Sequence, residues 1–344
     1  MNNWRKFLIG AAALTICLAP MSGLCAQKKE TKKSGNSALA AHVKAAKDFI
    51  GQQKFAEAID ELSKAIDENP KIPALYDNRA AMHYALQQYP DALTDYSKVV
   101  EMKPKDPKAY CNRGTVYRVQ NDYPKAMADF SKAIEVAPND AVGYFERGQT
   151  EVAQNQFKPA LVDLDKAIQL KPDDGNAYRY RGFADIGLSN WQEAIGDFDK
   201  AIEKNPKDAR AYERRAFAKR SLGHYADAIA DYNQSIQINP LDFESFDKRG
   251  YTYSLMKQWQ NAIADYNAAL AIQPGVPDTL SRLHFAQQQI APAQAAPTPT
   301  PPPPPPIIST VDWIVIGAVI LLIVIVVILF WARARSRSRT YNEE

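Results

Sequence analysis

Residue types recur every 34 positions along most of this chain. A proline marks the period and, counted as position 32, divides residues 39–276 into seven units: 39–72, 73–106, 107–140, 141–174, 175–208, 209–242 and 243–276. These prolines are Pro70, Pro104, Pro138, Pro172, Pro206, Pro240 and Pro274. Because self-similarity at a fixed period indicates stacked structural repeats, the pattern predicts an all-α solenoid.

Four positions in each unit keep one class of side chain. Position 4 is aromatic from the second unit onward, position 8 is small, position 20 is alanine, and position 24 is large and apolar. In the fifth unit these positions hold Tyr178, Gly182, Ala194 and Phe198. Small residues let two helices approach closely, and large ones fill the space between neighbouring hairpins. We therefore expect two packed helices in each unit.

The unit boundaries carry helix start and stop residues. An aspartate at position 34 can cap the next first helix, and the proline two residues earlier ends the preceding helix. These aspartates are Asp106, Asp140, Asp174, Asp208 and Asp242.

This register resembles the tetratricopeptide repeat family over residues 39–276, with the first unit weakest because His42 replaces the aromatic residue. The resemblance implies a right-handed superhelical solenoid of helix-turn-helix repeats with a concave groove lined by the first helices. Residues 277–290 should form a capping helix that shields the last apolar face.

Two charged positions depart from the family pattern together. Position 7, usually leucine in the family, is arginine in units two to seven, and position 23 is aspartate in the same units; the first unit lacks both. We expect structural pairs linking the two helices, in preference to an anion-binding track, because a bidentate fork explains arginine over lysine. The pairs are Arg79–Asp95, Arg113–Asp129, Arg147–Asp163, Arg181–Asp197, Arg215–Asp231 and Arg249–Asp265.

The segment 313–331 is apolar and uncharged, with a tryptophan at each end. Its nineteen residues predict a transmembrane helix of about 28 Å. Four arginines lie in the tail, 332–344, whereas the preceding flank offers only Asp312. The positive-inside bias therefore places the C-terminus in the cytoplasm and the repeats outside.

The other segments agree with this topology. Residues 1–26 have the basic start and short apolar run of a secretory signal peptide, followed by a polar basic linker, 27–38. An uncleaved anchor gives the same orientation, and lipidation of Cys25 is disfavoured by Leu24 before it. The proline-rich segment 291–310 predicts a semi-rigid spacer, with a ligand for a proline-binding domain as the alternative.

Composition narrows the chemistry. The net charge of +3 gives no sign of a nucleic-acid binder. The four histidines lack zinc-ligand spacing, no catalytic motif occurs, and the lone body thiol, Cys111, is expected to be an inert small hydrophobe. We therefore expect no catalytic residue, no metal site and no cofactor.

The remaining candidate is a binding groove. By the family resemblance, positions 2, 5, 9 and 12 face the concave side, and arginine and aromatic residues there are favoured as binding anchors. The hypothetical ligand site in units five and six comprises Arg179, Phe183, Arg210, Arg214, Phe217 and Arg220, with Glu213 offsetting part of the charge. An acidic or aromatic-containing extended peptide would suit it. Some of these rings could instead pack between hairpins, and a solvated basic face is the alternative for the whole set.

Three functions compete at this stage. The leading one is a membrane-anchored adaptor that gathers protein partners on the outer face, most simply in a bacterial periplasm. The family's carboxylate clamp is absent, because Val43, Lys47 and Asn112 stand where it needs lysine, asparagine and arginine, although Asn78 and Lys108 match. A glycan-associated envelope protein is the second function. A cytosol-facing import receptor on an organelle is the third, and both chain ends oppose it.

Overall fold

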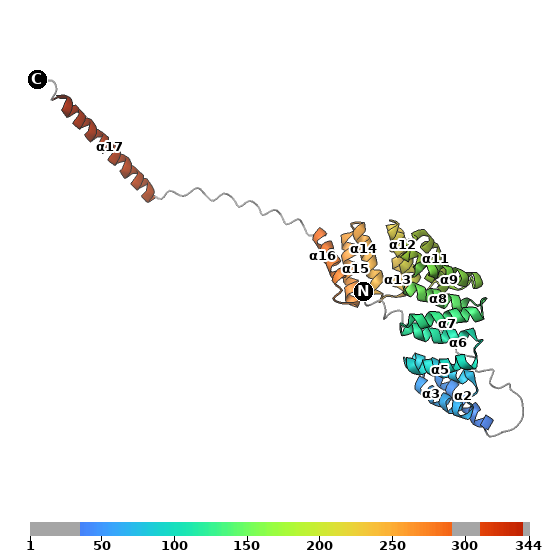
Figure 1. Cartoon of the computed structure of the whole chain (residues 1–344). Coiled ribbons are helices and arrows are strands. Elements are labelled where there is room, and N and C mark those ends of the chain that lie inside the picture. The colour runs from blue at the N-terminus through green and yellow to red at the C-terminus, as the bar shows by residue number, and fades with distance from the viewer. Residues whose placement is uncertain (1–34, 291–309, 340–344) are drawn as a thin grey trace. The chain divides into compact units, whose positions relative to one another are not determined.

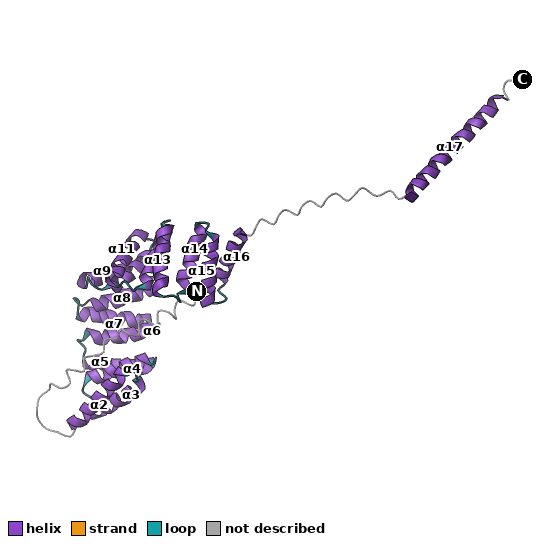
Figure 2. Ribbon diagram, turned by 180° about the vertical axis from the view of Figure 1, so that it is seen from behind, coloured by secondary structure: helices purple, strands orange, loops and turns teal. Residues whose placement is uncertain are grey.

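The computed structural model describes residues 35–290 and 310–339, which belong to two compact units. All secondary structure in these residues is α-helical (Figure 2). The predicted signal peptide, the proline-rich segment except Thr310, and the last residues, 340–344, lie outside the described residues.

The first unit contains a series of helical hairpins, side by side in Figure 1. Its helices are α2 (Gly35–Gly51), α3 (Phe55–Glu68), α4 (Pro73–Ala85), α5 (Tyr89–Met102), α6 (Pro107–Val119), α7 (Tyr123–Val136), α8 (Ala141–Ala153), α9 (Phe157–Leu170), α10 (Gly175–Gly187), α11 (Trp191–Lys204), α12 (Ala209–Ser221), α13 (Tyr225–Ile238), α14 (Phe243–Leu255), α15 (Trp259–Ile272) and α16 (Pro277–Ile290). Helices α2 to α15 pair as seven hairpins, and α16 is the expected capping helix. The all-α repeat fold is confirmed.

The hairpins keep the predicted register, with one correction. From α4 to α14, each first helix begins at position 1 of its repeat. Helix α2 begins at Gly35 instead, inside the segment 27–38 that we expected to be linker. No preceding repeat supplies a helix-ending proline there, so the first helix extends one turn further toward the N-terminus.

The turn inside each hairpin places position 15 in the left-handed region. Its φ is +83° at Gly223 and between 57° and 63° at the six other positions. Only glycine adopts this conformation without strain from a Cβ atom. Six of the seven turns therefore depend on the packing of their two helices to hold this conformation. The non-glycine residues are Gln53, Gln87, Asn121, Asn155, Ser189 and Lys257.

The core of each hairpin forms where position 8 faces position 24. A Cβ atom on Gly182 would lie 2.9 Å from Cζ of Phe198, and one on Gly250 would lie 2.9 Å from Cε1 of Tyr266. Both rings are fully buried. The small residues at position 8 therefore permit the close approach of two helices, as predicted. Cys111 is also buried, and burial raises the pKa of its thiol, which opposes thiolate chemistry.

The predicted helix caps form at four of five aspartates. Asp106, Asp140, Asp174 and Asp208 each accept a hydrogen bond from a backbone N–H in the first turn of the next helix. Asp242 does not cap α14, so that prediction was wrong. Its carboxylate accepts a hydrogen bond from the hydroxyl of Ser245 at 2.5 Å, which takes the place of the backbone donor.

The repeats join through their first helices. Each second helix packs on the next first helix, and successive first helices also contact one another, α6 with α8, α8 with α10, α10 with α12 and α12 with α14. From α6 to α14 the first helices therefore form one continuous layer, which is the surface that the family resemblance assigns to the groove.

The second unit contains α17 (Thr310–Arg339). Within it, Ile314–Arg333 has a mean hydropathy of 3.5, and this stretch is long and apolar enough to cross a membrane. The predicted span 313–331 lies inside this helix. The helix continues to Arg339, into the segment expected to be a basic tail.

Candidate binding surface on the first helices

Each predicted arginine–aspartate pair is a two-point hydrogen bond within one repeat. The arginine, on the first helix, donates from Nε and Nη2 to the two carboxylate oxygens of the aspartate on the second helix, at 2.5–2.9 Å. The aspartate side chains are 5–8 % exposed and the arginine side chains 16–27 %. All six pairs therefore lie at the boundary of the core.

The third guanidinium nitrogen reaches the preceding repeat. In each case Nη1 donates to the residue at position 25 of the preceding second helix, at 2.5–3.4 Å. One arginine thus ties three helices together. Position 25 was not among the residues predicted from the sequence, although it is polar in every repeat that precedes an arginine. The acceptors are Ser63, Ser97, Ser131, Asp165, Asp199 and Asn233.

These contacts leave little of the guanidinium for a ligand. Hydrogen bonds to Asp197, and then to Asp165, raise the pKa of Arg181 above its ordinary value despite partial burial. The ring of Tyr178 lies 5.6 Å from the guanidinium carbon. Because the group is engaged at its edges and on one face, the arrangement favours a structural role over an anion-binding track.

Two arginines of the hypothetical ligand site are engaged within the fold. Arg179 forms an ion pair with Asp208 at 3.2 Å and donates to Oδ1 of Asn176 at 2.7 Å. Arg214 forms an ion pair with Glu213 at 2.8 Å. Their charges are therefore partly satisfied before any partner binds.

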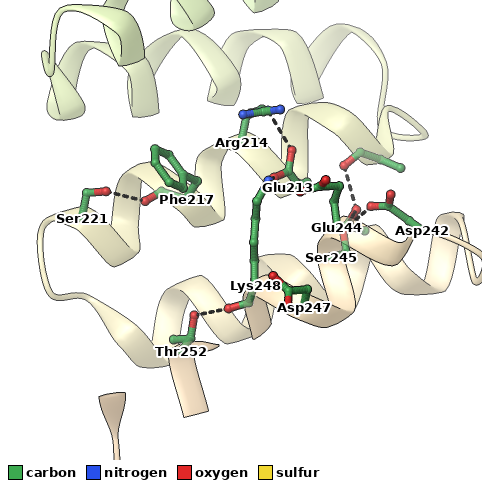
Figure 3. Close-up of polar contacts among 12 residues, drawn as sticks. Glu213, Arg214, Phe217, Ser221, Asp242, Glu244, Ser245, Asp247, Lys248 and Thr252 are labelled. Carbon is green, nitrogen blue, oxygen red and sulfur yellow. Dashed lines mark hydrogen bonds and ion pairs between the residues drawn. The ribbon is translucent and has the colours of Figure 1, made fainter. Parts of the chain in front are cut away.

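Glu213 is the centre of a buried polar cluster formed by the first helices of repeats six and seven. Arg214 and Lys248 approach its carboxylate from opposite sides, and Lys248 Nζ lies 2.5 Å from Oε1 (Figure 3). The side chain is buried, and burial by itself would raise its pKa. The neighbouring cations Arg214, Lys248 and Arg210 outweigh burial and leave the pKa of Glu213 lowered. Glu213 therefore stays ionised and holds two neighbouring repeats together.

The aromatic members of the site also pack between repeats. The ring of Phe183 lies 5.4 Å from that of Tyr180 and 5.7 Å from that of Phe198, and it packs beneath Arg214 at 5.7 Å. Phe217 contacts the ring of Trp191 at 5.8 Å. Both phenylalanines are half-buried, so each serves the fold while still presenting part of its surface.

The other two arginines differ from these. Arg210 and Arg220 are half-buried, and the guanidinium carbon of Arg220 lies 4.9 Å from the centre of the Phe217 ring. The structure thus brings Arg214 of α12 to Phe183 of the adjacent first helix α10, and Arg220 to Phe217 within α12. We propose that Arg210 and Arg220 are the cations of this surface that face a partner.

A further set of inter-repeat contacts was not foreseen. Position 5 of one repeat meets position 6 of the next, 35 residues later. Asp77 accepts from Asn112 at 3.0 Å, Glu213 pairs with Lys248, and Asp247 with Arg282 of the capping helix. The sequence does contain a signal for these contacts, because in each of them a carboxylate stands 35 residues before a side chain that can donate a hydrogen bond to it.

Comparisons with known proteins agree with this architecture. Models described as tetratricopeptide repeat match residues 107–140, 184–243 and 243–275, and one described as TPR repeat matches residues 80–118. A comparison with curated proteins finds none that matches the chain.

Solved structures show the same fold at low identity. A tetratricopeptide repeat protein from Parabacteroides merdae is 19 % identical, with a TM-score of 0.58 over 73 % of this chain and 99 % of that one. A chain in the structure of the APC/C hetero-tetramer Cut9–Hcn1 is 18 % identical, with a TM-score of 0.58 over 78 % of this chain and 57 % of that one. Part of a TPR protein from Cytophaga hutchinsonii is 19 % identical, with a TM-score of 0.52 over 70 % and 98 %. The repeat register, the hairpins and these matches together show that the chain contains tetratricopeptide repeats.

Proposed function

We propose that this protein is a membrane-anchored scaffold for protein–protein interaction. Partner peptides bind along the first helices of repeats five and six, on the extracytoplasmic side of the membrane. The observation that carries the proposal is the surface shared by α10 and α12, where Arg210, Arg220 and the half-buried rings of Phe183 and Phe217 lie among internally paired charges.

Such a surface suits a polypeptide partner. Arginine and aromatic side chains bury large areas and bind carboxylates or apolar groups without unfolding the helices that carry them. One of the structures with this fold, Cut9–Hcn1, is itself a complex of several chains. An acidic or aromatic-containing segment is the partner chemistry that this surface favours.

The proposed location follows from the sequence at both ends. Helix α17 supplies a membrane span, the arginines after it favour the cytoplasm, and the N-terminal segment has the pattern of an export signal. A bacterial inner membrane, with the repeats in the periplasm, is the simplest arrangement.

One experiment tests both the surface and its side of the membrane. Cells that express the full chain are treated with a crosslinker that cannot cross the inner membrane, and captured partners are identified. The wild-type repeats should be crosslinked. Arg210→Glu combined with Arg220→Glu should lose at least nine-tenths of partner capture, because two cations that face the partner become anions.

The control is thermal unfolding of the same double variant. Its midpoint should fall by no more than roughly a few degrees, because Arg210 contributes least of the three cations around Glu213 and the stability of the array depends mainly on contacts between neighbouring repeats. Capture of the same partners at undiminished yield would place the site elsewhere. If the repeats are not crosslinked in intact cells, and after lysis are crosslinked only to cytoplasmic proteins, the proposed orientation is wrong.

A further inference from the structure

Two repeats carry an arginine at position 12, and the chain itself shows what each one does. In repeat three, Nη2 of Arg118 lies 2.7 Å from Oε2 of Glu146, and their side chains are 14 % and 15 % exposed. Glu146 occupies position 6 of the next repeat, 28 residues later. The anion for Arg118 is therefore internal, and it comes from the adjacent first helix.

In repeat six the corresponding anion is missing. The residue 28 positions after Arg220 is Lys248, which is held by Glu213 at 2.5 Å and by Glu244 at 3.0 Å. Arg220 lies between two rings instead, with its guanidinium carbon 4.9 Å from the centre of Phe217 and 5.1 Å from that of Tyr251. In the range 35–290, no acidic side chain forms an ion pair with it. Contacts of this kind hold a guanidinium by its faces and leave its N–H edges for an acceptor.

Arg220 also lies within a longer row of rings. Position 9 is aromatic in three successive repeats and in the capping helix, as Phe183, Phe217, Tyr251 and Phe285, which we call the aromatic row. Tyr251 is 38 % exposed and Phe285 53 %, so the row remains open toward the C-terminal end. Arg282 stacks on Tyr251 at 5.4 Å, but its charge is satisfied by Asp247 at 2.5 Å.

We propose that Arg220 binds the carboxylate of an internal aspartate or glutamate in an extended partner peptide, whose apolar side chains contact the aromatic row on both sides. This inference rests on the proposed function, because it names what the same surface recognises. A planar guanidinium whose N–H edges are open matches a carboxylate in a bidentate geometry. The acidic residue is internal rather than terminal because rings continue in both directions from Arg220.

The spacing of the row sets the spacing of the peptide. Packed helices lie about 8–10 Å apart, and an extended chain advances about 3.3 Å per residue. Neighbouring rings are therefore about three peptide residues apart, and the four rings span about nine residues. Because Arg220 lies between the second and third rings, the expected segment has an acidic residue near its centre and large apolar residues one or two positions to either side.

Three labelled peptides of nine residues test this with the full chain in detergent micelles. The first has glutamate at its centre, leucine two positions to each side so that the three side chains share one face of an extended chain, and blocked ends. The second has glutamine in place of glutamate. The third has the glutamine centre and a free C-terminal carboxylate. Fluorescence anisotropy should show the first peptide binding the wild type at least tenfold more tightly than either of the others.

The matched variants are Arg220→Gln and Arg118→Gln, which alter the same repeat position. Arg220→Gln should abolish the preference for glutamate and change the thermal midpoint little, because no buried anion loses its partner. Arg118→Gln should keep the preference and lower the midpoint, because Glu146 is left buried without its cation. Arg220→Lys should lose most of the preference, since lysine keeps the charge without the planar fork.

Several outcomes would overturn the inference. Equal binding of the first two peptides, an undiminished preference in Arg220→Gln, or tightest binding of the third peptide each excludes an internal carboxylate at Arg220. If the first two peptides bind equally and Tyr251→Leu weakens both, the row still binds peptides and the proposed function stands without this role for Arg220. If the wild type binds none of the three, the inference fails, and the crosslinking experiment decides the proposed function separately.

Discussion

Position 9 of the repeat holds Lys47, Ala81, Thr115 and Gln149 in repeats one to four, and Phe183, Phe217, Tyr251 and then Phe285 in the second half. The interior of the hairpins shows no such division. Positions 7 and 23 form the same hydrogen-bonded pair from Arg79–Asp95 to Arg249–Asp265.

This contrast shows that scaffold and recognition are carried by different positions of one repeat. The core positions recur in every hairpin, and the pairs, whose arginines also reach the preceding second helix, recur in every repeat that has another before it. Positions 9 and 12 lie on the layer of first helices, where side chains can differ between repeats without altering the hairpin. A partner-binding surface can therefore occupy a few repeats of a uniform array.

The largest effect should come from breaking a pair of the interior. Asp197→Ala removes both acceptors of Arg181 Nε and Nη2 and leaves a half-buried cation. We expect a loss of about 3 kcal/mol in unfolding free energy, measured by urea titration of the full chain in detergent. Peptide binding should persist in the folded protein.

The control for this change is Asp165→Ala. Asp165 also accepts from Arg181, at 2.7 Å, but its side chain is 62 % exposed. An exposed ion pair contributes about 0.5 kcal/mol or less. If Asp197→Ala costs no more than Asp165→Ala, the pairs are not structural and the division between scaffold and surface does not hold.

A smaller effect should come from position 11, where repeats four and six differ. In repeat six, Lys219 lies 2.8 Å from Asp231. In repeat four, the same position is Glu151, which is buried beside Asp163, with no hydrogen-bond partner for Oε2. Burial, and then the charge of Asp163, raises the pKa of Glu151 to about 7.

The sign of the pH effect follows from this raised pKa. Between the ordinary glutamate pKa and about 7, the folded state binds the proton and the unfolded state does not. Stability should therefore fall as pH rises through this window and level off above it. Glu151→Gln should remove that part of the slope and raise the unfolding free energy at pH 8 by about 2 kcal/mol.

Urea titrations of both proteins from pH 4.5 to pH 8 measure this difference. Glu151→Lys extends the comparison, because it gives repeat four the pairing of repeat six and should also be more stable than the wild type at pH 8. Parallel curves for the wild type and Glu151→Gln would show that Glu151 does not titrate in this range.

Most of the interior could be predicted from the sequence because its determinants repeat. Proline every 34 residues located the hairpins, and the joint variation of positions 7 and 23 indicated pairs that the structure places within hydrogen-bonding distance. The cap at Asp242 failed because a neighbouring hydroxyl, from Ser245, competes for the carboxylate. Nothing in the repeat pattern reports such a local competition.

The ligand surface was harder to predict because exposure and pairing depend on neighbouring repeats. Arg179 and Arg220 look alike in sequence, yet Arg179 reaches Asp208, 29 residues later, whereas Arg220 meets two rings. These outcomes depend on side-chain directions across the interface between two hairpins. Comparing equivalent positions 28 and 35 residues apart would have recovered part of this information.

The smallest effect should come from replacing one buried and one exposed glycine of the same repeat by alanine. Gly182 lies on α10 against the ring of Phe198, where an added Cβ atom would approach within 2.9 Å, whereas Gly196 lies on α11 with open space around it. Gly182→Ala should lower the unfolding free energy by about 1.5 kcal/mol, because overpacking forces the ring and the helices apart. Gly196→Ala should raise it by about 0.7 kcal/mol, because alanine favours a helix interior over glycine. Opposite signs from the same substitution, measured by urea titration, would place the constraint in the packing of position 8. If Gly182→Ala is stabilising, the ring of Phe198 moves to accommodate the added Cβ atom, and close packing does not restrict position 8 to glycine in this repeat.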